Sequence, residues 1–227
     1  MVKITYLIPV FNEVKTIEKA INNIKSIRYS KKEILVIDNG STDGSQNIIK
    51  KIKGIKKILR KKNLGIGKTH IDAFKMATGK YLFRYDSDLE YDHLKSIYIL
   101  KYAEKNNLDM VFASRLKKSD NMIKKIIERP AYIATYLCTF LINSLYKKKI
   151  TDIIGTKLFK IRTIKKVPIT CDNMGFDFQH TSRIVKRRFR IGEVFIRYKP
   201  RKEGEKKIKF YHMVNAIYEI FKVKFFN

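Results

Sequence analysis

Four carboxylates gather at one point of a chain that is otherwise strongly basic. Within seven positions the sequence places Asp86, Asp88, Glu90 and Asp92. Asp86 and Asp88 flank the single residue Ser87 directly after an apolar stretch, so both carboxylates can face one divalent ion. Ligation by oxygen alone suits Mg²⁺ or Mn²⁺, which keep water ligands and share a diphosphate. Glu90 is a candidate third ligand, whereas Asp92 precedes a helical pattern and is expected to cap that helix.

The pattern of apolar residues places this cluster at the edge of a sheet. Strand and helix patterns alternate through residues 1–115, which predicts an α/β fold with a mostly parallel sheet and helices on both faces. We expect strands at 3–10, 33–37, 55–59, 81–85 and 110–114, and helices at 13–27, after a cap at Thr42 or Asp43, at 65–77 and at 93–105. Ligands of such sheets bind beyond the carboxyl ends of the strands. Segments 11–13, 38–41 and 86–88 all follow strands and should share that edge.

The second half of the chain contains two long apolar segments. Residues 130–146 carry no charge, but they are shorter than the roughly 20 apolar residues of a membrane span and include hydroxyl and amide side chains. This segment is predicted to form either a core helix or a helix at a membrane interface, and the sequence favours neither over the other. Residues 209–226 predict a basic amphipathic helix, suited to an anionic bilayer or to packing on its own domain. Strands are expected at 156–161 and 190–198, with a helix at 178–186 between them.

A glycine-rich segment invites comparison with a phosphate-binding loop but lacks its spacing. Residues 63–69 end in Gly-Lys-Thr, yet that loop needs a glycine where Lys62 stands. The glycines are expected where a helix N-terminus approaches another segment closely. Because helix N-termini attract anions, Lys68 is a candidate phosphate contact.

Five short motifs run through the first half in a fixed order: 8–13 (IPVFNE), 34–44 (ILVIDNGSTDG), 63–67 (NLGIG), 77–81 (ATGKY) and 86–88 (DSD). Their order and spacing resemble glycosyltransferase family 2. Three later segments, 112–115 (FASR), 151–160 (TDIIGTKLFK) and 191–204, are similar to the dolichyl-phosphate mannose synthase branch, which glycosylates polyprenyl phosphates. The resemblance covers nearly the whole chain. It implies the nucleotide-sugar-binding, Rossmann-like glycosyltransferase A fold.

The resemblance also implies a set of site residues. On the nucleotide-sugar side these are Pro9, Phe11, Glu13, Asp38, Asn39, Asp86 and Ser87, to which the helix N-terminus adds Lys68. The implied ligands of Mg²⁺ or Mn²⁺ are Asp86, Asp88 and Glu90. Arg115 and Arg201 should bind phosphate groups, and the candidate catalytic residues are these two arginines with Asp88 and Asp177.

The chain departs from the family pattern at several positions. Asn39 replaces the second Asp of the usual Asp-Asp-Gly-Ser, and Phe195 replaces the Pro of Glu-Val-Pro. Residues 204–207 lack the Ser of Gly-Glu-Ser-Lys. Thr181 stands where an acidic residue is common, which leaves Asp177 as the nearby carboxylate for a general base. Alternatively, and slightly favoured, Asp177 is a carboxylate at the start of a helix.

The leading hypothesis is an inverting, metal-dependent hexosyltransferase. It would move a mannose- or glucose-type hexose from a GDP- or UDP-linked sugar to a polyprenyl or dolichyl phosphate. A lipid phosphate is already an anion, so it needs cations to position it rather than a strong base. A saccharide hydroxyl in surface glycan assembly is the alternative acceptor, and it would make Asp177 essential.

The net charge of +29, from 50 Lys and Arg against 21 Asp and Glu, calls for an anionic partner. A compositional bias toward Lys, Ile and Asn accounts for part of the excess. A basic nucleic-acid-binding protein is a remote alternative that explains the charge but not the carboxylate cluster, and the sequence has no known reader motif. We therefore expect an anionic membrane surface and no nucleic acid.

No clear linker divides the chain, so residues 1–227 are expected to form one glycosyltransferase domain. It would comprise a nucleotide-sugar-binding half (1–115), an acceptor-side half (116–208) and a tail helix (209–227). Two widely spaced cysteines fit a reducing compartment, and the first residues lack the pattern of a signal peptide. The expected location is the cytoplasm, peripherally attached to the cytoplasmic face of a membrane.

Overall fold

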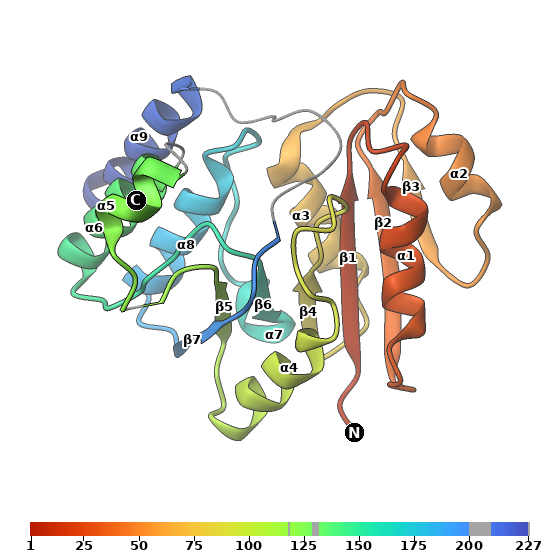
Figure 1. Ribbon diagram of the computed structural model, residues 1–227, viewed down its shortest axis with the longest axis horizontal. Helices are drawn as coiled ribbons and strands as arrows, with labels where there is room; N and C mark the ends of the chain where they lie inside the picture. Colours follow the sequence, from red (N-terminus) through yellow and green to blue (C-terminus); the bar gives the residue numbers. More distant parts are fainter. Residues whose placement is uncertain (118, 129–131, 200–209, 227) are drawn as a thin grey trace.

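A seven-stranded, mostly parallel sheet forms the centre of the computed structural model, which describes residues 1–117, 119–128, 132–199 and 210–226 (Figure 1). The strand order is β3-β2-β1-β4-β6-β5-β7. The strands are β1 (Ile4–Val10), β2 (Lys32–Asp38), β3 (Lys56–Leu59), β4 (Tyr81–Arg84), β5 (Met110–Ser114), β6 (Lys157–Lys160) and β7 (Ile191–Phe195). Only β6 runs against its neighbours, β4 and β5. The expected mostly parallel sheet is confirmed, but the insertion of β6 between β4 and β5 was not predicted.

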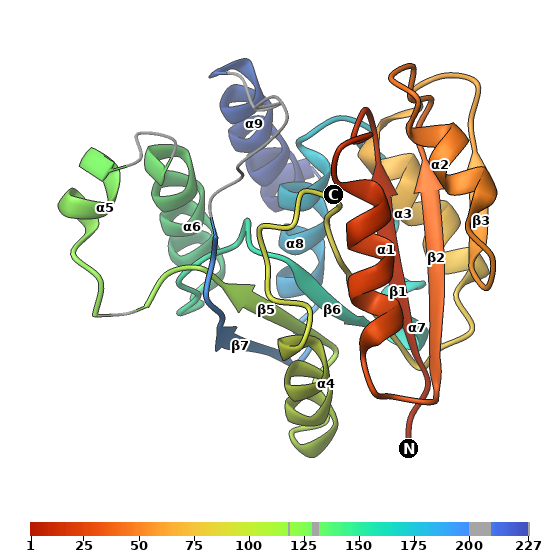
Figure 2. The same ribbon diagram turned by 45° about the vertical axis from the view of Figure 1, so that its right-hand side comes forward.

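Helices cover both faces of this sheet, as expected (Figure 2). They are α1 (Ile17–Ser26), α2 (Ser45–Lys51), α3 (Gly65–Met76), α4 (Lys95–Lys105), α5 (Met122–Glu128), α6 (Tyr132–Tyr146), α7 (Ile161–Ile164), α8 (Phe176–Lys186) and α9 (Phe210–Phe226). Helices α1, α2 and α4 contribute to one apolar cluster. Helices α3, α6, α7, α8 and α9 contribute to the other. β1 alternates between them, since Tyr6 and Ile8 belong to the first and Leu7 to the second. Such burial on both faces explains the nearly continuous apolar sequence of this strand.

Two expected helix starts differ from the observed ones. The helix expected directly after Thr42 or Asp43 begins at Ser45, and the residue at its N-cap is Gly44 with φ 98°. Asp43 still holds the first residue of this helix, because its Oδ1 accepts the N–H of Ser45 at 3.0 Å. Its Oδ2 accepts the N–H of Val14 at 2.9 Å, which ties two loops together. Asp92 accepts the N–H of Leu94 at 2.9 Å, but this bond closes the turn that precedes α4 rather than its first helical turn.

Helix α6 is buried on one side only. Its Cys138 and Ile142 are fully buried in the second cluster, whereas Ile133 and Phe140 are exposed. The helix therefore packs on the core with one side and faces solvent with the other. Among the described residues no helix has the length and hydropathy needed to cross a membrane.

Two histidines lie in the core between α3 and α8. His70 is fully buried, and the side chain of His180 is 2% exposed. Both rings contact Phe176, with centroid distances of 4.3 Å for His70 and 5.4 Å for His180. The Nε2 atoms of both rings are buried and have no hydrogen-bond partner in the described part of the chain. Burial lowers the pKa of His70 to about 4 and that of His180 to about 3, so both rings are neutral at pH 7.

We expect mild acid to destabilise the fold through these two histidines. In the unfolded chain their pKa returns to about 6.5. Stability from the neutral rings is therefore present above pH 6.5 and lost as the pH falls toward the lower folded pKa values. Between pH 7 and pH 5 the free energy of unfolding, measured by urea titration, should fall by about 2 kcal/mol per histidine. His180→Phe, which keeps a ring against Phe176, should remove roughly half of this loss, and an unchanged loss would contradict the assignment.

Candidate active site

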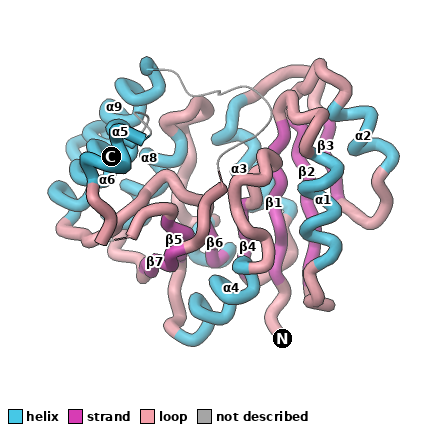
Figure 3. Tube along the Cα trace, viewed as in Figure 1, coloured by secondary structure: helices cyan, strands magenta, loops and turns pink. Residues whose placement is uncertain are grey.

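The carboxyl ends of β1, β2 and β4 meet at one edge of the sheet, as predicted. β1 lies between β2 and β4, and the three strands run parallel. The loops after them gather at the upper edge of the sheet (Figure 3). The N–H of Asn39 donates to the carbonyl of Val10 at 2.8 Å, and the Ser87 hydroxyl donates to the carbonyl of Pro9 at 3.0 Å. These bonds fasten both neighbouring loops to β1, so the predicted segments form a single rim.

The first loop of the rim is partly built into the fold. Pro9 lies within β1, and Phe11 directly after this strand is half-buried. Glu13 is 6% exposed; its carboxylate accepts the Thr16 hydroxyl at 3.1 Å, and its N–H donates to the Ser45 hydroxyl at 2.9 Å. Of the three residues predicted here, Phe11 is therefore more available to a ligand than Glu13, which also supports the loop itself.

Asp38 ends β2 and is fully buried. Its Oδ1 accepts the N–H groups of Gly40 and Ser41, both at 3.0 Å, and the side-chain amide of Gln46 at 2.6 Å. Its Oδ2 is buried without a hydrogen-bond partner among the described residues. A buried acceptor left without a donor costs free energy. This oxygen is therefore suited to accept an N–H group from a ligand.

Asn39 bonds to the chain itself. Its Oδ1 accepts Nη1 of Arg60 at 2.6 Å and the N–H of Leu64 at 3.1 Å, and its Nδ2 donates to Oδ1 of Asn63 at 2.5 Å. An amide can both donate and accept, which a second Asp at this position could not do. Asn39, which we expected to reach a nucleoside, thus holds the 60–64 loop in place. Sequence reasoning missed Arg60, its main partner.

Lys68 lies near the start of α3 in an ion pair with Asp72 at 2.8 Å, and Arg60 reaches the other oxygen of Asp72 at 2.6 Å. The expected close approach at this helix start is present. A Cβ atom on Gly67 would lie 1.9 Å from the carbonyl oxygen of Cys171, so only glycine fits there. Lys68 is 38% exposed on its side chain and can still turn toward an anion.

The predicted metal pair follows β4. Asp86 is held by Arg84, with Nε 2.8 Å from Oδ1 and Nη2 3.2 Å from Oδ2. Asp88 accepts the N–H of Glu90 at 3.2 Å, and Glu90 accepts the Tyr198 hydroxyl at 2.9 Å. In the part of the chain that the structure describes, no three His, Cys, Asp or Glu side chains come together as a metal cluster. The expected three-carboxylate set is therefore not assembled, and Glu90 instead binds the segment after β7.

Two carboxylates still fit a hard divalent ion. Mg²⁺ is usually bound by one or two carboxylates together with waters and substrate phosphates. Asp86 and Asp88 supply two such oxygen donors at the end of a strand, and both are only partly buried. The donor set therefore suits an ion that brings its own phosphate ligands.

A buried charge network lies directly behind this pair. Arg84 on β4 contacts Asp177 at 2.7 Å, and Lys157 on β6 contacts the other oxygen of Asp177 at 2.9 Å. The side chain of Lys157 is 1% exposed. Although burial by itself raises the pKa of Asp177, the adjacent Arg84 and Lys157 hold that pKa well below its usual range. Asp177, in the first turn of α8, is therefore a doubly paired anion and a weak base.

A second ion pair joins the later segments. Arg115, directly after β5, donates Nε to Oδ2 of Asp152 at 2.7 Å and Nη2 to Oδ1 at 3.0 Å. Asp152 is fully buried, and its own N–H donates to Glu193 at 3.1 Å. The guanidinium lies 5.3 Å from the ring of Tyr132 and 5.6 Å from that of Tyr198. Segments 112–115, 151–160 and 191–198 thus meet at one point, although the sequence did not identify Asp152 or Glu193 as the residues that join them.

The ion pair with Asp152 leaves Arg115 fewer N–H groups with which to bind a phosphate. Two of its nitrogens are committed to Asp152, and Nη1 has no hydrogen-bond partner in the described residues. Arg201 lies outside the described residues. The last described residue before it, Lys199, donates its N–H to the carbonyl of Glu90 at 2.8 Å. The segment that leads toward Arg201 therefore passes over the acidic loop.

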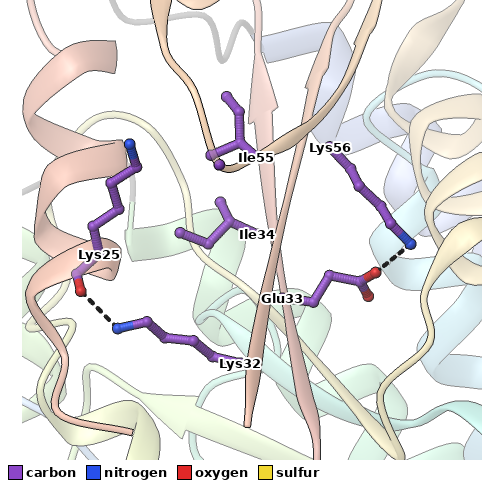
Figure 4. A pocket seen from close by; sticks show the side chains of 7 residues that line it. Lys25, Lys32, Glu33, Ile34, Ile55 and Lys56 are labelled. Atoms are coloured by element: carbon purple, nitrogen blue, oxygen red, sulfur yellow. Dashed lines mark hydrogen bonds and ion pairs between the residues drawn. The ribbon is translucent and has the colours of Figure 1, made fainter. Parts of the chain in front are cut away.

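A cavity of about 490 Å³ lies at the opposite, amino-terminal end of β2 and β3 (Figure 4). Its lining residues are Lys25, Lys32, Glu33, Ile34, Gly54, Ile55 and Lys56. Lys56 pairs with Glu33 at 2.5 Å, and Lys32 donates to the carbonyl of Lys25 at 2.6 Å. These polar groups already bind one another, far from the strand ends where ligands of such sheets lie. We therefore assign the site to the rim and not to this cavity.

A comparison with protein families matches residues 5–167 to the model of glycosyl transferase family 2. The match covers well over half of the chain. This chain therefore belongs to glycosyltransferase family 2, as its motifs suggested.

Curated relatives match only part of the chain. An uncharacterized glycosyltransferase of Rickettsia bellii (strain RML369-C) is 33% identical over 107 residues, which are 46% of this chain and 16% of that protein. The poly-β-1,6-N-acetyl-D-glucosamine synthase of Staphylococcus aureus (strain COL) is 31% identical over 101 residues, or 43% of this chain and 24% of that protein. The matched region thus spans less than a quarter of either relative. Neither name supports the dolichyl-phosphate mannose synthase branch.

Solved structures extend the likeness to the whole fold. Glucosyl-3-phosphoglycerate synthase from Mycobacterium tuberculosis, in complex with Mn²⁺, UDP and glucosyl-3-phosphoglycerate, superposes with a TM-score of 0.74 over 98% of this chain and 80% of that chain, at 16% identity. The same synthase with Mg²⁺ and UDP gives 0.72 over 98% and 79%, at 15% identity. The chain therefore has the glycosyltransferase A fold that was expected.

The Arg115–Asp152 pair should be essential to stability. Asp152→Asn leaves Arg115 buried without its counter-charge, which should lower the free energy of unfolding by about 3–5 kcal/mol. Glu104→Gln is the control, because its partner Lys80 is half-exposed at 3.4 Å and such surface pairs contribute about 1 kcal/mol or less. Urea unfolding of the two variants measures both effects. Equal losses would contradict a supporting role for the buried pair.

Proposed function

We propose that this chain is a metal-dependent hexosyltransferase that moves a sugar from a nucleotide diphosphate to a lipid phosphate. The proposal rests on the arrangement of carboxylates at the rim, the edge of the sheet formed by the loops after β1, β2 and β4. Asp38, with one buried oxygen that lacks a donor, and the pair Asp86 and Asp88 stand at the ends of strands on either side of β1. This arrangement suits a ligand with an N–H-bearing base at one end and a metal-bound diphosphate at the other. The M. tuberculosis synthase, crystallised with UDP and Mn²⁺ or Mg²⁺, has the same fold.

On this proposal the residues of the rim have separate tasks. Asp38 accepts an N–H group of the nucleotide base, and Phe11 packs beside it. Asp88 and Asp86 hold Mg²⁺ or Mn²⁺, and Arg84 keeps Asp86 oriented through its two hydrogen bonds. When bound there, such an ion would supply positive charge to offset that of the diphosphate. Both GDP- and UDP-linked donors are compatible with these contacts.

The state of Asp177 favours an anionic acceptor. A phosphate oxygen already carries the charge it needs to attack the anomeric carbon from the face opposite the diphosphate, which inverts the configuration at that carbon. A hydroxyl acceptor must lose a proton to a base, and Asp177 is bound by Arg84 and Lys157 with a depressed pKa. A polyprenyl or dolichyl phosphate is therefore our proposed acceptor. Arg115 and the neighbouring lysines would attract its phosphate.

The proposal includes a place for the protein: peripherally bound at the cytoplasmic face of a membrane. The net charge of +29 and the lysines of α9 support attraction to anionic lipid. We also retain the proposal that residues 1–227 act as one domain, since strands from both halves share the sheet. A saccharide acceptor, as the name of the S. aureus relative suggests for that protein, is the competing outcome of the tests below.

Nucleotide binding should depend on metal and on Asp88. UDP or GDP at about 100 times its Kd, with Mn²⁺, should stabilise the fold by about 2.7 kcal/mol and raise Tm by roughly 5–10 °C for a chain of this size. Asp88→Asn should remove the metal-dependent part of the shift. Asp92→Asn is the control in the same loop, because its asparagine still accepts the N–H of Leu94. A thermal-shift assay in which neither nucleotide acts, or in which Asp88→Asn behaves like the control, would refute the rim site.

A double variant separates the two acceptors. Asp177→Asn alone leaves Lys157 buried and unpaired, whereas Asp177→Asn with Lys157→Met removes both charges. If the acceptor is a lipid phosphate, the double variant should form labelled glycolipid within about tenfold of the Lys157→Met control. Loss of a true general base costs roughly 10²–10⁴-fold. A loss of that size in the double variant, with normal thermal stability, would favour the saccharide acceptor.

A further inference from the structure

Three helices expose apolar side chains that the core does not use. On α6 these are Ile133, Leu137 and Phe140; on α9 they are Val214, Tyr218, Phe221 and Phe225; on α5 they are Met122, Ile123 and Ile127. Each is at least 36% exposed. Helix α5 has no buried residue at all. On α6 and α9 the exposed positions recur every three or four residues, so each helix presents one continuous apolar stripe.

The stripes of α6 and α9 lie on two helices that pack against each other. The two helices contact each other and both pack on α8. The buried sides of both helices belong to one cluster, with Cys138 and Ile142 from α6 and Ala216 and Ile220 from α9. The amine of Lys224 fastens them by donating to the carbonyl of Leu145 at 2.8 Å. Helices α5, α6 and α9 lie together at the end of the molecule opposite α1 and α2 (Figures 1 and 2).

Lysines lie on or directly after these helices. The lysines on or directly after the three helices are Lys124, Lys125, Lys147, Lys148, Lys149, Lys222 and Lys224. Glu128 and Glu219 are the acidic residues of these helices, and Glu219 is buried. Apolar side chains bordered by lysines are the pattern of helices that lie in the interface of an anionic bilayer. The chain as a whole carries a net charge of +29, which attracts an anionic surface.

We propose that α5, α6 and α9 form a docking face for an anionic phospholipid bilayer, into which their exposed apolar side chains insert. Helix α6 connects this face with the acceptor side of the site. Its buried Tyr132 and Thr135 contact Arg115, at 5.3 Å from the ring centroid and 3.5 Å from the hydroxyl. An α-helix is about 10 Å across, so Arg115 lies roughly one helix diameter from the exposed side. Docking would thus bring a membrane-borne phosphate to this end of the sheet, a consequence that rests on the proposed function.

Vesicle flotation tests the docking face. The full chain should float with vesicles of phosphatidylcholine and phosphatidylglycerol at 7:3 and show at least tenfold weaker binding to phosphatidylcholine alone. Phe140→Ser with Tyr218→Ser should weaken binding to the anionic vesicles at least tenfold. The control is Leu94→Ser with Tyr98→Ser, which removes two equally exposed apolar residues near α4, outside the face. Thermal unfolding confirms that both double variants fold.

Results that would contradict the docking face differ from results that would contradict the proposed function. The proposal is overturned if the wild type does not bind anionic vesicles, or if the control variant loses binding equally. It is also overturned if the face variant instead dissociates a dimer in size-exclusion chromatography while the wild type ignores vesicles. Failure of the proposed function looks different, because the nucleotide-induced thermal shift would then be absent in a protein that still floats. Activity on a water-soluble, short-chain prenyl phosphate should be unchanged in the face variant.

Discussion

Asp177 forms ion pairs with two cationic side chains from different strands, and these ion pairs join the two halves of the chain. Arg84 comes from β4, in the half that forms the rim, and lies 93 positions from Asp177. Lys157 comes from β6 and is buried beside them. Charges removed from water must be paired closely to be tolerated, so these residues fix the position of α8 against the centre of the sheet. Arg84 also binds Asp86, and the orientation of the candidate metal ligand therefore depends on this buried network.

The same constraint shapes the chemistry of the site. A carboxylate held by two cations is a poor proton acceptor but a good anchor. Asp177 is thus better suited to organise Arg84 and Lys157 than to deprotonate an acceptor, and this is the reason that we propose a phosphate acceptor. The pair of Arg115 and Asp152 has a corresponding role on the other side, where it joins the ends of β5 and β7 beneath α6.

Much of the fold could be predicted from the sequence because the alternation of apolar strands and amphipathic helices is a local signal. The loops after β1, β2 and β4 were expected on one edge, and the motif spacing pointed to the correct family. The partners of buried charges are not local. Nothing in the sequence around Arg84 indicates Asp177. The antiparallel direction of β6, which brings Lys157 to the other oxygen of Asp177, has no sequence pattern of its own. For the same reason the sequence did not indicate that Glu90 accepts the hydroxyl of Tyr198, which comes from a distant segment.

The most direct measurement is anomalous diffraction from crystals of the protein soaked with Mn²⁺ and either UDP or GDP. The central claim is that one rim holds both the metal and the nucleotide. It predicts an anomalous peak in contact with the carboxylate of Asp88, and density for the base with an N–H group at Oδ2 of Asp38. A manganese peak bound elsewhere, or a nucleotide away from the ends of β1, β2 and β4, would contradict it.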